Sequence, residues 1–196
     1  MDRQTSLSIP IVLGSVRRNR RSHDAARLLV DRVSALGHQP VLVDLRELNL
    51  PIYDEEESSE GHQSVRAFRG LMATCDASVW LSPEYNHGYT SVIKNAVDYL
   101  RPEIRRKPVA VCGLSSGVMG GVRAVEQLKQ VFIELHAVPI RASVYFNDAR
   151  SLFGPDGSLT RPEIVDRIDD VVADLVWYAR SLKWGRENLP MPERKR

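Results

Sequence analysis

The sequence has few cysteines, little excess charge and no long hydrophobic run. Its two cysteines, Cys75 and Cys112, lie at a predicted helix end and in a predicted apolar strand, which favours reduced packing residues over a disulfide. The formal net charge of +2 is too small to indicate a nucleic-acid partner. No apolar run is long enough to span a membrane, and the first residues lack the core of a secretion signal. We therefore expect a cytoplasmic protein with no membrane or nucleic-acid partner.

Motifs of several other enzyme classes are also missing. The loop after the first predicted strand contains neither the P-loop pattern Gly-x-x-x-x-Gly-Lys-Ser/Thr nor the dinucleotide pattern Gly-x-Gly-x-x-Gly. The five histidines are scattered, without the spacing of a metal site, so we expect no bound metal. Only His87 falls within a candidate site. We interpret it as a loop residue rather than a proton donor, because no neighbouring residue in the sequence orients its ring.

What is present is a regular alternation of apolar strands and amphipathic helices over 196 residues. Strands are predicted near 8–13, 39–44, 77–82, 108–113 and 138–146, and helices near 22–36, 62–75, 90–100, 119–135 and 161–183. Such alternation predicts one α/β domain, spanning residues 1–196, with a parallel sheet covered on both faces. Thr160 and Glu163 are spaced as a capping box for the last helix. Residues 1–6 and 186–196 are expected to be flexible ends.

The loop after the first strand is suited to binding a phosphate. It runs from Gly14 to Ser22, where a helix begins, and it carries serines and several arginines. The N–H groups of a helix N-terminus attract an anion, Ser15 and Ser22 add hydroxyl donors, and Arg17 can donate two parallel hydrogen bonds. For Arg18, Arg20 and Arg21 taken singly, solvated surface charge is the favoured interpretation.

The loop Ser82–Gly88 follows the third strand and contains residues that suit close approach to a flat ligand. Pro83 has no N–H group to leave unpaired, and Tyr85 offers a ring for stacking. Asn86 tolerates left-handed backbone geometry, and Gly88 lets the chain turn tightly. In a parallel sheet this loop lies at the ligand-binding edge. The alternative is an ordinary strand-to-helix turn.

A third loop, from Gly113 to Gly121, contains Ser115, Ser116 and several glycines where the fourth strand meets a helix. The glycines indicate close backbone approach, either to a ligand or only between the helix and the sheet.

Together these loops resemble the NADPH-dependent FMN reductases of flavodoxin-like fold, which include quinone, azo-dye and chromate reductases. The shared motifs are Gly-Ser-Val-Arg after the first strand, Pro-Glu-Tyr-Asn after the third and Ser-Ser-Gly-x-x-Gly-Gly after the fourth. Residues 50–55 and 94–98 also fit, and the resemblance extends from Ile9 to about Leu182. It implies a doubly wound, five-stranded sheet of order 2-1-3-4-5 with helices on both faces.

The resemblance also implies a function and a set of contacts with bound FMN. NADPH or NADH would reduce the flavin, which would pass two electrons to a quinone, azo, nitro or metal-oxyanion acceptor in a ping-pong cycle. No catalytic side chain is expected. The residues expected to bind FMN are Ser15, Arg17, Arg20, Ser22, Pro83, Glu84, Tyr85, Asn86, Ser115 and Gly117.

Relatives pair through the helices after strands three and four, which implies a homodimer or homotetramer. Tyr99 and Phe132 are candidates for that contact, although each fits the core equally well. Two other functions remain open from the residues. One is a flavin-binding electron carrier or sensor without substrate turnover, and the other is a flavin-free interaction module that keeps the fold.

Overall fold

The protein is built on a parallel sheet whose strands follow the predicted order. The computed structural model describes residues 5–54 and 61–190. The main path of the sheet is β2-β1-β3-β4-β5, and β6 pairs with the end of β4. The bounds are β1 (Ser8–Leu13), β2 (Gln39–Asp44), β3 (Ser78–Pro83), β4 (Pro108–Leu114), β5 (Val138–Pro139) and β6 (Tyr145–Phe146). The chain reverses its winding between β1 and β3, and ligands bind at such a switch point in open α/β sheets.

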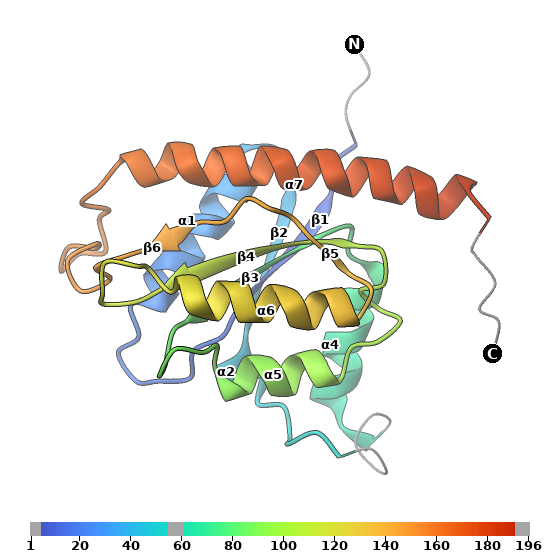
Figure 1. Cartoon of the computed structure of the whole chain (residues 1–196), viewed down its shortest axis with the longest axis horizontal. Coiled ribbons are helices and arrows are strands. Elements are labelled where there is room, and N and C mark those ends of the chain that lie inside the picture. Colours follow the sequence, from blue (N-terminus) through green and yellow to red (C-terminus); the bar gives the residue numbers. More distant parts are fainter. Residues whose placement is uncertain (1–4, 55–60, 191–196) are drawn as a thin grey trace.

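Helices cover both faces of the sheet (Figure 1). The helices are α1 (Ser22–Ala35), α2 (Leu45–Leu48), α4 (Gln63–Thr74), α5 (Ser91–Asp98), α6 (Val122–Glu134) and α7 (Glu163–Asn188). One hydrophobic core joins the sheet to α1 and α7, and a second joins it to α4, α5 and α6. The short helix α2 was not predicted. Within the described ranges, no helix combines the length and the hydropathy needed to cross a membrane.

The two cores follow the alternation of side chains along the central strands. Val79 and Leu81 of β3 belong to the core of α1 and α7, whereas Trp80 between them belongs to the other core. Every residue of β3 and β4 is buried, as expected for strands covered on both faces. The prediction of a doubly wound α/β domain architecture is therefore confirmed at the level of the sheet.

Tyr99 and Phe132, the two candidates for a subunit contact, are core residues. Phe132 is completely buried, with its ring centroid 5.1 Å from that of Trp80. Tyr99 is 4% exposed, and its hydroxyl donates to the carbonyl of Pro51 at 3.1 Å. Neither side chain is available to a second copy, because each completes the packing between a helix and its own chain.

The edge of the sheet beyond β4 is less regular than predicted. The strand predicted over 138–146 forms only the two short pieces β5 and β6. Between them, Lys129 Nζ of α6 donates to the carbonyl of Arg141 at 2.9 Å, and Arg167 Nε of α7 donates to that of Ser143 at 3.1 Å. These helix side chains provide the edge segment with hydrogen bonds that do not belong to the sheet.

The last helix begins and ends later than predicted. Its N-cap is Pro162, and the Thr160 hydroxyl instead donates to the carbonyls of Ser151 and Leu152, so the predicted capping box is wrong. At the other end, residues 186–188 form the last turn of α7, within the segment predicted to be flexible. Within the predicted flexible ends, residues 1–4 and 191–196 lie outside the described ranges.

Both cysteines are buried and free, as predicted. Burial raises the pKa of the Cys75 thiol to about 11 and that of the Cys112 thiol to about 12. Both thiols are therefore protonated at neutral pH and serve as small apolar packing groups.

Candidate functional site

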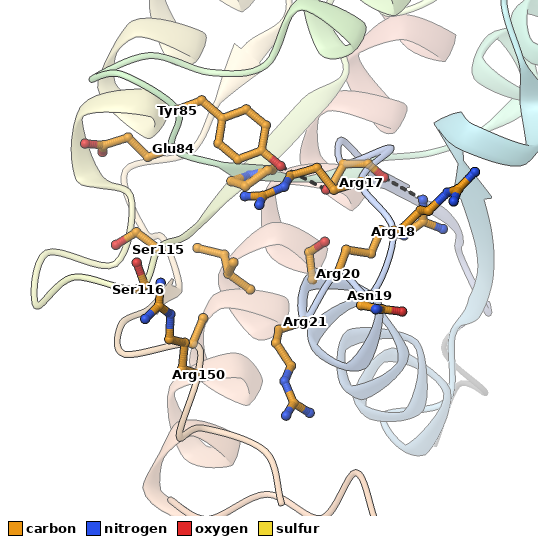
Figure 2. A pocket seen from close by; sticks show the side chains of 15 residues that line it. Arg17, Arg18, Asn19, Arg20, Arg21, Glu84, Tyr85, Ser115, Ser116 and Arg150 are labelled. Atoms are coloured by element: carbon orange, nitrogen blue, oxygen red, sulfur yellow. Dashed lines mark hydrogen bonds between the residues drawn. The ribbon is translucent and has the colours of Figure 1, made fainter. Parts of the chain in front are cut away.

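A cleft of about 260 Å³ opens at the carboxyl ends of β1, β3 and β4 (Figure 2). Loops that are far apart in the sequence meet there because parallel strands end at the same edge of a sheet. Figure 2 shows Arg17 and Tyr85 on one side of the cleft and Ser115, Ser116 and Arg150 on another. The lining residues are Ser15, Arg17, Arg18, Asn19, Arg20, Arg21, Ser22, Pro83, Glu84, Tyr85, Leu114, Ser115, Ser116, Ala149 and Arg150.

The start of the first loop is held closely against the sheet and α5. Gly14 N donates to the carbonyl of Leu81 at 2.9 Å, and the hydroxyl of Thr90 donates to the carbonyl of Gly14 at 2.6 Å. A Cβ on Gly14 would lie 2.0 Å from Cδ1 of Ile93. A larger residue at the point where β1 turns into the cleft would therefore require the buried Ile93 side chain to move.

Arg20 stabilises the same loop through contacts with the loop backbone and with β2. Its Nη1 donates to the carbonyl of Ser15 at 2.7 Å, and its Nη2 pairs with the carboxylate of Asp44 at the end of β2. The side chains of Arg20 and Asp44 are only 9% and 12% exposed. A shielded, charge-assisted pair of this kind fixes the curvature of the loop.

The N-terminus of α1 offers unused hydrogen-bonding groups to the cleft. The N-cap residue of this helix is Arg21, and no side chain within the described ranges caps it. The buried Ser22 Oγ has no hydrogen-bond partner among the described residues. Buried hydroxyls are almost always paired, so an unpaired one at a helix N-terminus and among arginines fits an anionic ligand. The donors present here suit a phosphate group.

Tyr85 connects the second loop to the first. Its hydroxyl lies 3.2 Å from Ser15 Oγ, and the guanidinium carbon of Arg17 lies 5.6 Å from its ring centroid. The second distance is within the range of a cation–π contact. Tyr85 thus lines the cleft while its hydroxyl contacts Ser15 and its ring face contacts Arg17, both in the first loop.

The turn after Tyr85 is formed by Asn86 and His87 rather than by Gly88. Tyr85 and Gly88 exchange backbone hydrogen bonds of 3.0 and 3.1 Å, and the two residues between them have positive φ, 50° at Asn86 and 67° at His87. Two successive positive φ angles define a type I′ hairpin turn. Gly88 itself is not in the left-handed region, so the prediction that it supplies the turn is wrong. His87 is a loop residue whose carbonyl accepts from Gln127 Nε2 at 2.9 Å.

Glu84 points away from the loop backbone toward the start of α6. Its Oε2 accepts from the backbone N–H groups of Arg123 at 3.1 Å and Ala124 at 3.5 Å, and its Oε1 pairs with Arg123 Nη1 at 3.3 Å. A carboxylate at a helix N-terminus is favourable because it satisfies unpaired N–H groups and opposes the helix dipole. Glu84 therefore joins the second loop to α6, the helix that follows the third loop.

In the third loop the glycines serve helix–sheet packing. A Cβ on Gly113 would lie 2.5 Å from the carbonyl oxygen of Gly120, and Gly121 caps α6 with φ of 89°. Ser115 Oγ donates to the carbonyl of Gly117 at 3.1 Å and accepts from its N–H at 3.3 Å. Residues 113–117 also match the Gly-x-Ser-x-Gly pattern of hydrolases, but the described residues that line the cleft include no histidine to activate this serine.

A match that spans most of the chain shows its family. The family model "NADPH-dependent FMN reductase" matches residues 7–151. The chain belongs to this family. A quinone reductase of Pseudomonas putida is 30% identical over 174 residues, covering 83% of this chain and 91% of that protein. An NADPH azoreductase of a Bacillus species is 26% identical over 173 residues, covering 88% and 94%.

Solved structures agree with this family assignment. The flavoenzyme NAD(P)H:(acceptor) oxidoreductase FerB from Paracoccus denitrificans superposes with a TM-score of 0.77 at 25% identity, covering 89% of this chain and 98% of that one. A Streptococcus flavodoxin has a TM-score of 0.54 at 13% identity, covering 87% and 98%, and so shares the fold alone. The flavodoxin-like fold predicted from the sequence is confirmed.

In this member of the FMN reductase family, eight of the ten predicted site residues line one cleft, and Asn86 and Gly117 do not. Sequence reasoning missed the contribution of the chain after β6, which brings Ala149 and Arg150 to the cleft. The signal was available in principle, because that segment follows the last strand at the same edge of the sheet. Among the described residues, no cluster of His, Cys, Asp or Glu side chains is arranged to hold a metal.

Proposed function

We propose that the cleft binds FMN, with the FMN phosphate at the N-terminus of α1. The observation that carries this proposal is the buried, unpartnered hydroxyl of Ser22 beside Arg17 and Arg21 in a chain of the FMN reductase family. A dianion there would accept from Ser22 and from the uncapped helix N-terminus, and arginine side chains would balance its charge. The whole chain would then act as one FMN-binding domain.

The flavin ring would lie along the loops after β3 and β4. Residues 83–86 and 115–117 supply a proline, the Tyr85 ring and exposed backbone groups, which suit a flat aromatic ligand. Arg20 would act on the cofactor through the loop that it fixes, because two of its nitrogens already bind Ser15 and Asp44. Glu84 would act similarly by holding the second loop to α6.

The flavin, when bound, accepts a hydride from NADPH or NADH and passes two electrons to a small acceptor such as a quinone, azo, nitro or metal-oxyanion compound. The residues of this chain bind and orient the cofactor, and none is required as a nucleophile or a general base. The relatives named as quinone reductase and azoreductase support an acceptor of this class.

Two measurements test the proposal in sequence. Purified protein saturated with FMN should show a flavin absorption spectrum shifted from that of free FMN. It should then oxidise NADPH in the presence of a soluble quinone, with parallel double-reciprocal lines, because donor and acceptor share one open flavin face. Protein that stays colourless after incubation with FMN would refute the cofactor assignment. Intersecting lines would refute the shared face.

A flavin-dependent electron carrier or sensor is the alternative from the sequence. It would bind FMN through the same loops but show negligible NAD(P)H oxidation without a partner reductase. The family match to reductases favours turnover.

A homodimer through α5 and α6 remains a prediction, and its contact would use exposed side chains such as Ile133. A cytoplasmic location also remains a prediction.

A further inference from the structure

A second hollow, of about 520 Å³, lies at the opposite end of β4 from the cleft proposed to bind FMN. Lys107, which lines this hollow, directly precedes β4, whereas Leu114 at the far end of the strand lines the cleft. β4 has seven residues, so about 20 Å separates the two places. A ligand in the hollow is therefore not a ligand of the cleft.

The hollow is rich in cations. Its lining residues are Ala73, Pro102, Glu103, Arg105, Arg106, Lys107 and Arg186. Glu103 is the one acid in this set, and its carboxylate is already engaged. Its Oε1 accepts from Arg69 Nε at 2.6 Å, and its Oε2 accepts from the backbone N–H of Arg101 at 2.9 Å. Because the acid is paired with a cation outside the set, these seven residues, here called the basic hollow, keep an excess of positive charge.

Two of the cations have roles in the fold. Lys107 Nζ donates to the carbonyls of Met72 and Ala73 in the last turn of α4, at 2.8 and 2.5 Å. Arg186 Nη1, in the last turn of α7, donates to the carbonyl of Arg106 at 2.7 Å. Burial lowers the pKa of both Lys107 and Arg186, and the charge of Arg186 lowers that of Lys107 further. The fold therefore holds like charges together in a place partly shielded from water.

Arg105 has no comparable role in the fold. Its Nε is buried and has no hydrogen-bond partner among the residues that the structure describes. The turn around it is closed by the backbone instead, since Arg105 N donates to the carbonyl of Pro102 at 3.2 Å. Buried polar groups are almost always paired, so an unpaired guanidinium nitrogen in a basic hollow indicates a missing anion.

We propose that the basic hollow binds a phosphate group through the guanidinium groups of Arg105 and Arg186. A guanidinium group offers parallel N–H donors that match two oxygens of a phosphate, which a lysine ammonium does not. A phosphate ester carries a charge of about −1.5 to −2 at pH 7 and would offset the positive excess. Ala73 and Pro102 add apolar wall, so the hollow suits the phosphate of a small ester as well as inorganic phosphate.

Calorimetric titration with inorganic phosphate tests the proposal on the full-length protein, loaded with FMN and freed of excess FMN by gel filtration. The wild type should bind one phosphate per chain, and chloride at matched ionic strength should give no saturable heat. Arg105→Ala should weaken phosphate binding at least tenfold, and Arg105→Lys should restore only part of the loss. Arg27→Ala, at an exposed position of α1, is the control and should bind as the wild type.

Two further comparisons separate this site from the cleft. Arg105→Ala should leave the affinity for FMN unchanged, whereas Arg17→Ala should weaken FMN binding and leave the phosphate affinity of the basic hollow unchanged. The proposal does not depend on FMN binding. If the chain does not retain FMN, titration of the FMN-free Arg17→Ala protein and of its double variant with Arg105→Ala measures the same difference.

Thermal melts give an independent readout. Phosphate should raise the melting temperature of the wild type and not that of Arg105→Ala, because only a folded chain with the site gains from the ligand. Glucose 6-phosphate in place of phosphate distinguishes the source: tighter binding identifies a phosphorylated metabolite, and equal or weaker binding identifies inorganic phosphate. The proposal is overturned if neither anion binds the wild type, or if Arg105→Ala binds phosphate as the wild type does.

Discussion

The Tyr85 hydroxyl lies 3.2 Å from Ser15 Oγ and joins two loops whose residues are 70 positions apart in the sequence. The same tyrosine ring lies under the guanidinium group of Arg17, at 5.6 Å from the ring centroid. One side chain therefore holds the loop that follows β1 and also forms part of the cleft wall. Because its two roles use different atoms, substitution can separate them.

Tyr85→Phe should weaken FMN binding only a few-fold, because it removes one neutral hydrogen bond worth about 1 kcal/mol. Tyr85→Ala should weaken binding at least about tenfold, since the ring and its cation–π contact are lost as well. Flavin titration followed by fluorescence measures both constants. Tyr89→Phe, a tyrosine that does not line the cleft, is the control. Equal effects of Phe and Ala at position 85 would assign no role to the ring.

Arg17→Ala should reduce FMN affinity by roughly tenfold to a hundredfold, because a charge-assisted hydrogen bond contributes about 1.5–3 kcal/mol. Activity should return when FMN is supplied in excess, since Arg17 is proposed to bind the phosphate and to take no part in electron transfer. Titration and steady-state assays check the two statements. Arg27→Ala on α1 should behave as the wild type. An unchanged dissociation constant for Arg17→Ala would contradict the phosphate assignment.

Ser22→Ala should separate binding from stability. Among the residues that the structure describes, the buried Ser22 hydroxyl has no partner, so its removal should leave the melting temperature of the FMN-free protein unchanged or raise it. FMN affinity should nevertheless fall by about tenfold, because a donor to the phosphate is lost. Thermal melts with and without FMN make the comparison. A variant that is destabilised without FMN and binds FMN normally would show that the hydroxyl is structural.

Glu84→Gln should destabilise the fold by about 1 kcal/mol, because it removes the charge that faces the N-terminus of α6 and Arg123. Urea unfolding of the FMN-free protein measures the change. Glu126→Gln, at an exposed position of the same helix, is the matched control and should have little effect. If Glu84→Gln and Glu126→Gln are equally stable, the contact with α6 contributes nothing measurable.

Stability should decrease at alkaline pH because of the buried Cys112 thiol. Burial raises its pKa from 9.0 to about 12, so above pH 9 the unfolded chain loses the thiol proton while the folded chain keeps it. The unfolding free energy should then fall by up to about 1.4 kcal/mol per pH unit between these two values. Urea unfolding from pH 8 to 11 measures this slope. Cys112→Val should reduce the slope, and an identical slope would exclude the thiol as its cause.

The elements that could be read from the sequence are those whose pattern is local. The alternation in Val79-Trp80-Leu81 and the apolar stripe of α7 depend only on neighbours along the chain, so the strands and helices were predictable to within a few residues. The break in the last strand was not predictable, because it coincides with bonds from Lys129 and Arg167 on two other elements. Thr160 failed as a cap for a similar reason, since its hydroxyl binds carbonyls of an earlier turn.

The sequence by itself determined the family, the sheet order that the family implies and the three loops that form the cleft. Motifs and hydrophobic periodicity depend only on residues that are close together along the chain. Only the tertiary structure decided which side chains of those loops are available to a ligand. Arg20 and Ser22 are two residues apart, yet the guanidinium of Arg20 is engaged by Asp44 from another strand and the hydroxyl of Ser22 has no partner among the described residues. Partners of this kind are set by which strands lie side by side, and one stretch of sequence does not contain that information.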